Sequence, residues 1–152
     1  MISSTSGVKI STMVSFRNKA DNPPAAASAQ TATDPQTVEE IPLAALLERV
    51  QRMQIEGWRI VQACCTRLVA DQEVNYSFDK GGHLHTLRVR LPMNDPELPS
   101  ISPFYWSAFL YENEMHDLFG ITVKGMAVDF HGHLYTTMVP TPYVTREPDH
   151  GE

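Results

Sequence analysis

Four ionisable side chains lie within six positions of a stretch that is otherwise apolar and aromatic. They are Glu112, Glu114, His116 and Asp117, and a phenylalanine–tyrosine–tryptophan run shortly precedes them. Carboxylates near surface that becomes covered need partners, because a buried unpaired charge is costly. Where this short chain does not supply those partners, we expect another chain to supply them.

Three kinds of chemistry fit these side chains. Glu112 and His116 are spaced i, i+4 and would form a local pair at a partly solvated helix end. The same spacing suits a metal, although neither H-E-x-x-H nor paired C-x-x-C is present. Further imidazoles lie in two pairs: His83 and His85, and His131 and His133. In the third interpretation, Glu114 and Asp117 meet arginines or backbone amides of a partner protein.

The same residues resemble a family signature, E-R-E-x-x-D-[LM]-[FY]-G-[IV]. It belongs to the C subunit of respiratory complex I (NADH dehydrogenase) and to the equivalent small subunit of membrane-bound energy-converting nickel–iron hydrogenases. The matching positions are Glu112, Glu114, Asp117, Leu118, Phe119, Gly120 and Ile121. Asn113 stands where the family usually has arginine. The segment 125–143 is closer to the hydrogenase branch, and the resemblance covers roughly residues 38–145.

The resemblance implies a non-catalytic, cofactor-free structural subunit of a membrane-bound redox complex, with no active site on this chain. It would dock on the nickel–iron or quinone-facing large subunit of an energy-converting hydrogenase, and it would brace that subunit and the neighbouring small iron–sulfur subunit. The nickel–iron centre and the iron–sulfur clusters are then expected in those partners. The expected partner interface comprises Glu112, Glu114, Asp117, Phe119 and Gly120.

Two other functions remain open from the sequence. Within the family, the chain would be the C subunit of an NADH-quinone oxidoreductase, a complex that also belongs to electron transport. In a different class, it would be a small metal-dependent hydrolase that uses Glu112, His116 and the paired histidines. The adjacent Cys64 and Cys65 cannot by themselves hold an iron–sulfur cluster, which needs four cysteines, and we expect them to be small apolar residues of a strand.

Composition limits the partners and the location. The 152 residues suit one domain plus tails, and the net charge of −6 disfavours nucleic acid as a partner. No apolar run approaches the roughly 20 residues of a membrane helix, and the first 20 residues lack the apolar region of a secretory signal. We expect a cytoplasmic protein held peripherally on the inner face of the cell membrane through partner subunits.

The pattern along the chain predicts three parts. Residues 1–36 are rich in Ser, Ala, Thr, Pro and Asn and are expected to form a flexible tail, residues 37–140 an α+β domain, and residues 141–152 a C-terminal extension. A helix is predicted over 37–56, with a capping box at Thr37 and Glu40 or a start near residue 41 because of Pro42. A strand follows over 58–69.

A hairpin and a second helix are predicted next. Strands over 73–78 and 83–91 alternate around a turn at 79–82, and pairing Phe78 with His83 places their apolar residues on one face. The second helix begins with Ser102 as N-cap and ends at Gly120. A short strand over 121–123 and a last hairpin formed by 126–130 and 134–139 complete a two-layer α+β domain, whose mixed β-sheet is covered by helices, with flexible N- and C-terminal tails.

Overall fold

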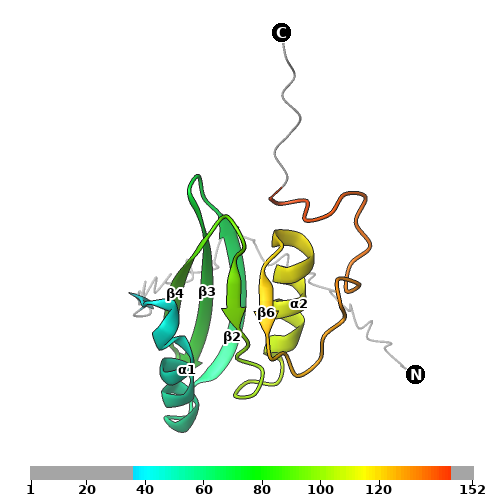
Figure 1. Ribbon diagram of the computed structural model, residues 1–152. Helices are drawn as coiled ribbons and strands as arrows, with labels where there is room; N and C mark the ends of the chain where they lie inside the picture. The colour runs from blue at the N-terminus through cyan, green and yellow to red at the C-terminus, as the bar shows by residue number, and fades with distance from the viewer. Residues whose placement is uncertain (1–35, 145–152) are drawn as a thin grey trace, which may run out of the picture. The chain divides into compact units, whose positions relative to one another are not determined.

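The computed structural model describes residues 36–144, so most of both predicted tails lies outside the described residues (Figure 1). The elements are β1 Gln36–Glu40, η1 Leu43–Ala45, α1 Leu46–Ile55, β2 Arg59–Arg67, β3 Asp71–Lys80, β4 His83–Pro92, β5 Glu97–Pro99, α2 Ala108–Phe119 and β6 Thr122–Lys124. One sheet has the order β1-β4-β3-β2, and β5 pairs with β6 in a second. Since β1 is parallel to β4 while β2, β3 and β4 are antiparallel, the predicted α+β fold with a mixed sheet is confirmed.

Alternation along the central hairpin builds the core. Successive residues of a strand face opposite sides, and the apolar set of β3 and β4 is fully buried on one side. These residues pack with Leu46 and Val50 of α1 and with Ala108 and Met115 of α2 in one cluster. The buried set from the hairpin is Val74, Tyr76, Phe78, Leu87, Val89 and Leu91.

Each residue of β3 pairs with a residue of β4 that lies two positions further along the chain than predicted. Phe78 lies opposite His85, and Lys80 lies opposite His83. A shift of two keeps every side chain on its predicted face, because the side-chain period of a strand is two. The turn is therefore the two residues Gly81 and Gly82, both with positive φ as such tight turns require. His83 is exposed at this end of the hairpin.

The beginning of the first predicted helix is instead strand β1. Residues 37–40 pair with β4 in register from Thr37↔His85 to Glu40↔Arg88. Pro42 follows after Ile41, and the residue before a proline is disfavoured in the helical region. The helix proper therefore begins at Leu46, and Gly57 follows its end with φ +83°.

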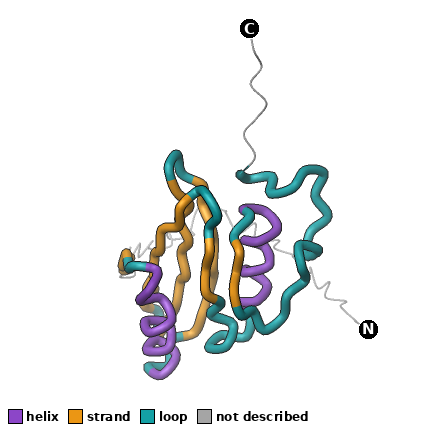
Figure 2. The backbone as a smooth tube through the Cα atoms, viewed as in Figure 1, coloured by secondary structure: helices purple, strands orange, loops and turns teal. Residues whose placement is uncertain are grey.

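The last predicted hairpin is wrong, and a different pairing was missed. Residues 125–144, called the strap below, contain no strand and follow an irregular path beside α2 (Figure 2). Positive φ at Gly125, His131, Gly132 and Thr141 breaks any extended run there. The short strand β6 was predicted, but it pairs in parallel with β5, which lies in a proline-flanked connector that gave no strand signal.

The buried Tyr76 hydroxyl has no hydrogen-bond partner among the described residues. Leaving a buried polar group unpaired costs about 1–3 kcal/mol, so Tyr76→Phe is expected to stabilise the chain by about 1 kcal/mol. The matched control is Tyr105→Phe, which removes a 2.9 Å bond to the Trp58 carbonyl and is expected to destabilise by about 1 kcal/mol. Urea unfolding measures both, and a destabilised Tyr76→Phe would contradict the structure.

Candidate docking surface

Helix α2 carries the signature residues and ends as its sequence predicts. Gly120 has φ +68°, and its N–H donates to the carbonyls of His116 and Met115. The helix begins later than predicted, at Ala108, because the N–H groups of Phe104 and Tyr105 both bond to the Ile101 carbonyl in a tight turn. Ser102 is therefore not the N-cap.

Glu112 lies inside the protein, with no exposed surface. Its carboxylate accepts hydrogen bonds from the Ser100 hydroxyl at 2.6 Å and from the Ile101 N–H at 2.7 Å. The predicted pairing with His116 is wrong, because the His116 ring nitrogen Nδ1 lies 3.1 Å from the Asp117 carboxylate instead. Burial raises the pKa of Glu112, although its hydrogen bonds act in the opposite direction.

Two serines extend this network to the strap. The Ser100 and Ser102 hydroxyls lie 2.6 Å apart, and the Ser102 oxygen accepts a 2.8 Å hydrogen bond from the Ala127 N–H. The network thus joins α2 to the residues after β5 and to the beginning of the strap. Sequence reasoning missed both serines as partners; the only signal was their alternation around Ile101, which is fully buried.

Asn113 and Asp117, one turn apart, hold the middle of the strap. The Asn113 amide donates to the Val128 carbonyl at 2.9 Å and accepts from the Phe130 N–H at 2.8 Å. The second Asp117 oxygen accepts from the Tyr135 N–H at 2.9 Å. Asn113 therefore clamps the backbone of the strap from the position where the family usually has arginine.

The other predicted interface residues border a groove between β2 and α2. It has a volume of about 210 Å³ and is lined by residues 63–65 of β2, by Tyr111, Glu114, Met115 and Phe119 of α2, and by Tyr143 of the strap. Glu114 is half-buried there and takes part in no ion pair within residues 36–144. Gly120 lies beside it at a close approach, where an added Cβ would be 3.0 Å from Thr141.

Apolar side chains are exposed along α2 and the strap. Trp106 is 64% exposed and Leu110 48% exposed. The Phe109 ring contacts both the Trp106 ring and the half-exposed Phe130 ring of the strap. Further along the strap, the exposed apolar residues are Tyr135, Met138, Val139 and Tyr143. We name the set Trp106, Phe109, Leu110 and Phe130 the aromatic patch.

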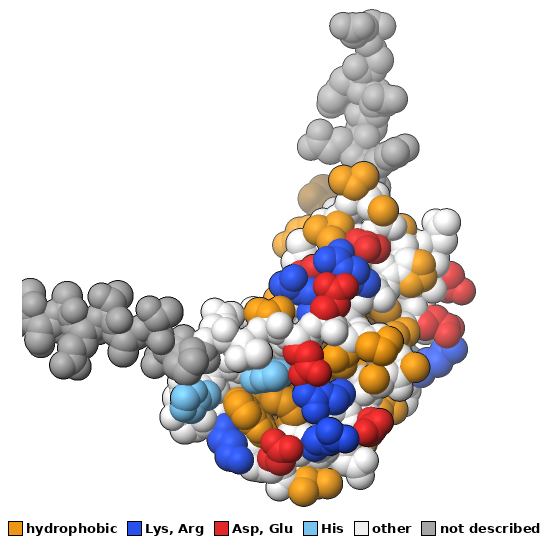
Figure 3. Space-filling model, turned by 90° about the vertical axis from the view of Figure 1, so that its left-hand side faces the viewer, with side chains coloured by type: hydrophobic (Ala, Val, Ile, Leu, Met, Phe, Trp, Pro, Cys, Tyr) orange, Lys and Arg blue, Asp and Glu red, His pale blue; other side chains and the backbone are white. Residues whose placement is uncertain are grey.

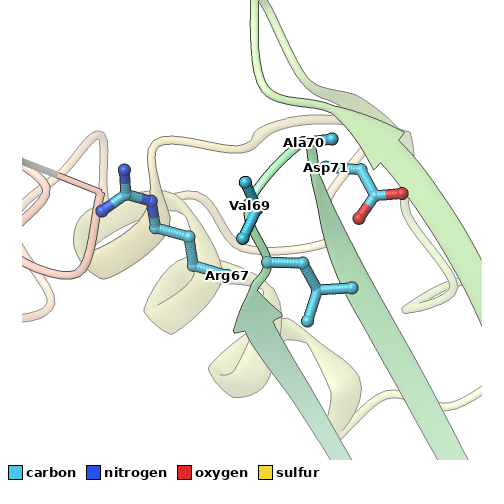
Figure 4. A pocket seen from close by; sticks show the side chains of 5 residues that line it. Arg67, Val69, Ala70 and Asp71 are labelled. Atoms are coloured by element: carbon cyan, nitrogen blue, oxygen red, sulfur yellow. The ribbon is translucent and has the colours of Figure 1, made fainter.

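The remaining surface offers less to a partner or a ligand. Charged side chains on the polar face of the sheet pair with one another, since Arg88 bonds Glu73 and Arg90 bonds Glu40 of β1, Asp71 and Glu73. Acidic and basic side chains also alternate over the face drawn in Figure 3. At the turn between β2 and β3, the charged groups of Arg67 and Asp71 point in opposite directions and do not converge on a ligand (Figure 4).

The structure does not assemble the metal site of the hydrolase alternative. Within residues 36–144, no three His, Cys, Asp or Glu side chains come together in a way that would hold a metal. His85 lies 3.1 Å from Glu39, and His131 lies 3.3 Å from Asp129. Over the same residues, no helix is long and apolar enough to cross a membrane.

Comparison with known proteins adds a family and a fold. Residues 32–141 match the family described as "Respiratory-chain NADH dehydrogenase, 30 Kd subunit". The C/D subunit of NADH-quinone oxidoreductase from Gluconacetobacter diazotrophicus is 43% identical over 56 residues, 37% of this chain and 8% of that one. The C subunit of F(420)H(2) dehydrogenase from Methanosarcina mazei is 45% identical over 38 residues, 25% of this chain and 24% of that one. The matched regions are thus small parts of both relatives.

Two solved structures share the fold. One is the archaeal membrane-bound sulfane sulfur reductase, with a TM-score of 0.59 and 17% identity over 64% of this chain and 61% of that one. The other is the trypsin-resistant fragment of Nqo5, with a TM-score of 0.55 and 22% identity over 61% of this chain and 82% of that one. At these identities the likeness establishes the fold alone.

Glu112 gives the stability of the chain a testable dependence on pH. Burial raises its pKa above the ordinary 4.5, so the native chain holds this proton more tightly than the unfolded chain. The contribution of this bound proton to the free energy of unfolding is then fully present below pH 4.5, and it is lost as the pH rises through the pKa of Glu112 in the native chain.

Glu112→Gln carries no such proton. Its free energy of unfolding, relative to the native sequence, is therefore expected to rise with pH between about pH 4 and about pH 7. Urea unfolding across this range measures the difference, with the exposed Glu48→Gln on α1 as the control. A difference that stays constant or falls with pH would contradict the burial of an ionisable Glu112.

Proposed function

Because this chain belongs to the respiratory-chain NADH dehydrogenase 30 kDa subunit family, we propose that it is a docking subunit of a membrane-bound respiratory redox complex. Its role is structural, with no active site or cofactor of its own. The names of the similar proteins support this role, because they describe complexes acting on NADH, on F(420)H(2) and on sulfane sulfur. A part common to complexes with such different substrates suits a task that does not depend on the substrate.

The observation that carries the proposal is the aromatic patch, with further exposed apolar side chains at Tyr135, Met138 and Val139 of the strap. Large contiguous apolar surface on a folded protein marks an interaction site, and aromatic residues are enriched at such sites. The strap is also held to α2 by part-buried hydrogen bonds from Asn113 and Asp117, so its shape is defined before any partner binds. A preorganised surface loses less entropy on binding.

The partner we propose is the large subunit of the complex, with the small iron–sulfur subunit as its neighbour. One relative is named as a joined C/D subunit, and a single chain carrying both letters fits an arrangement in which the two parts lie side by side. Association with the membrane would then be peripheral, through these partners. The nickel–iron centre and the iron–sulfur clusters belong to them.

The identity of the large subunit depends on which of two branches of the family this chain belongs to. We propose the nickel–iron subunit of an energy-converting hydrogenase first, because the strap segment 129–132 resembles that branch. An NADH-quinone oxidoreductase is the second candidate, and the 43% identity to a protein of that name favours it. In both branches the same surface would meet the large subunit.

Co-purification with a tagged full-length chain after mild detergent extraction tests the docking role. Leu110→Glu places a charge in the aromatic patch and is expected to lower recovery of the partners by about tenfold or more, since each 1.4 kcal/mol of lost affinity is about tenfold. Ile55→Glu is the matched control, because Ile55 is a 77% exposed apolar residue at the end of α1 outside the patch. Both free chains should melt at the native temperature.

Equal recovery with both variants would contradict docking through the aromatic patch. The identity of the recovered proteins decides the branch. A large subunit with four cysteines and bound nickel supports the hydrogenase, whereas NADH-oxidising subunits support the quinone oxidoreductase.

A further inference from the structure

The groove between β2 and α2 has walls fixed by hydrogen bonds. The Gln72 amide donates to the Phe119 carbonyl at 3.2 Å and its oxygen accepts from the Cys65 thiol. On the strap side, the Tyr143 N–H donates to the Leu118 carbonyl at 3.1 Å, and the Tyr143 ring packs edge-on against Phe119 at 5.1 Å. The groove is therefore a formed feature of this fold rather than a gap between loose segments.

The size of the groove suits one long side chain. Its volume of about 210 Å³ lies below the range of about 300–1,000 Å³ typical of small-molecule pockets. Apart from one carboxylate, its lining is made of aromatic rings, a methionine, an alanine and two cysteines. Burial raises the pKa of Cys65 to about 12, so that this thiol carries no charge at neutral pH.

Glu114 is the one carboxylate in this lining, and no basic residue lines the groove with it. Nor does any residue within 36–144 form a salt bridge with Glu114, although many other carboxylates of the chain are paired. A carboxylate at an apolar groove is complementary to a cation on an apolar stem. Among protein side chains, arginine fits best, because its planar guanidinium stacks on aromatic rings and is more weakly hydrated than a lysine ammonium.

Building on the docking role proposed above, we infer that this groove receives one arginine side chain of the partner protein, with the guanidinium on Glu114 and the stem between Tyr111, Phe119 and Tyr143. Arginine is enriched at interfaces and at their energetic centres. Glu114 would then differ in role from Glu112 and Asp117, whose carboxylates already have partners within the chain.

Arginine footprinting of the purified complex with phenylglyoxal, read by mass spectrometry, tests this inference. With Glu114→Gln, one arginine of the partner is expected to be modified about tenfold faster than in the native complex, the factor that corresponds to about 1.4 kcal/mol of lost pairing. Glu48→Gln on α1 is the control and should change no partner arginine. The melting temperature of the free Glu114→Gln chain should equal that of the native chain, since no internal pair is lost.

Some outcomes overturn the inference while leaving the docking role intact. One is an assembled Glu114→Gln complex in which no partner arginine gains reactivity. Another is a response from an arginine of this same chain, such as Arg67 or Arg146, the latter outside the described residues, which would mean that the groove is filled from within. A partner lysine that becomes reactive to amine acylation in place of an arginine also overturns it.

A different result separates the two proposals. If no partner co-purifies with the native chain, the docking role fails, and this inference fails with it. If Glu114→Gln folds but does not assemble, the footprint is taken on Glu114→Asp, whose shorter side chain keeps the charge but lengthens the pair. There the same arginine should gain reactivity by a smaller factor, and no gain overturns the inference.

Discussion

Three polar side chains on the buried side of α2 must find hydrogen-bond partners inside the chain, and the rest of the C-terminal half is arranged around those partners. A buried polar group left unpaired costs about 1–3 kcal/mol, and more when it is charged. Glu112, Asn113 and Asp117 meet this requirement with backbone N–H groups and the Ser100 hydroxyl. None of these backbone groups belongs to a helix or strand. Each of these three side chains therefore holds a segment that is not held by the hydrogen bonds of a helix or sheet.

The consequence is a division between inward and outward residues of one short signature. The inward residues shape the turn after β5 and the strap, whereas Glu114 of the signature borders the groove on the surface of α2. The strap therefore presents apolar side chains to the solvent without a core of its own. A segment of this kind is stable because α2 holds it, and it is suited to receive another protein because its shape is set in advance.

Much of the fold was predictable because its signals are local. Alternation in β3 and β4 gave the buried face, and Gly120 gave the end of α2, since both depend only on neighbouring residues. The register of the β3–β4 hairpin was harder to predict from the sequence, because two registers that differ by two residues place the same side chains on the same face. The strand β1 was mistaken for helix, since its stability comes from pairing with the distant β4 rather than from its own sequence. The polar cluster of α2 stood out in the sequence, but its partners inside the chain did not, because the backbone N–H groups of Ala127 and Tyr135 carry no sequence pattern that marks them as partners.

Side chains of α2 hold the strap in place. The most direct test of this hold is amide hydrogen exchange of Phe130 and Tyr135 in the Asn113→Ala variant, with the core amide of Val89 as the reference. We expect the Phe130 amide to exchange at least about tenfold faster in this variant, because its N–H loses its acceptor. The exchange rate of the Val89 amide, relative to the rates of the other core amides, should be the same as in the native chain. Glu114→Ala, on the same helix but outside the clamp, should leave Phe130 and Tyr135 unchanged. Native exchange at Phe130 in Asn113→Ala would contradict the proposed hold of α2 on the strap.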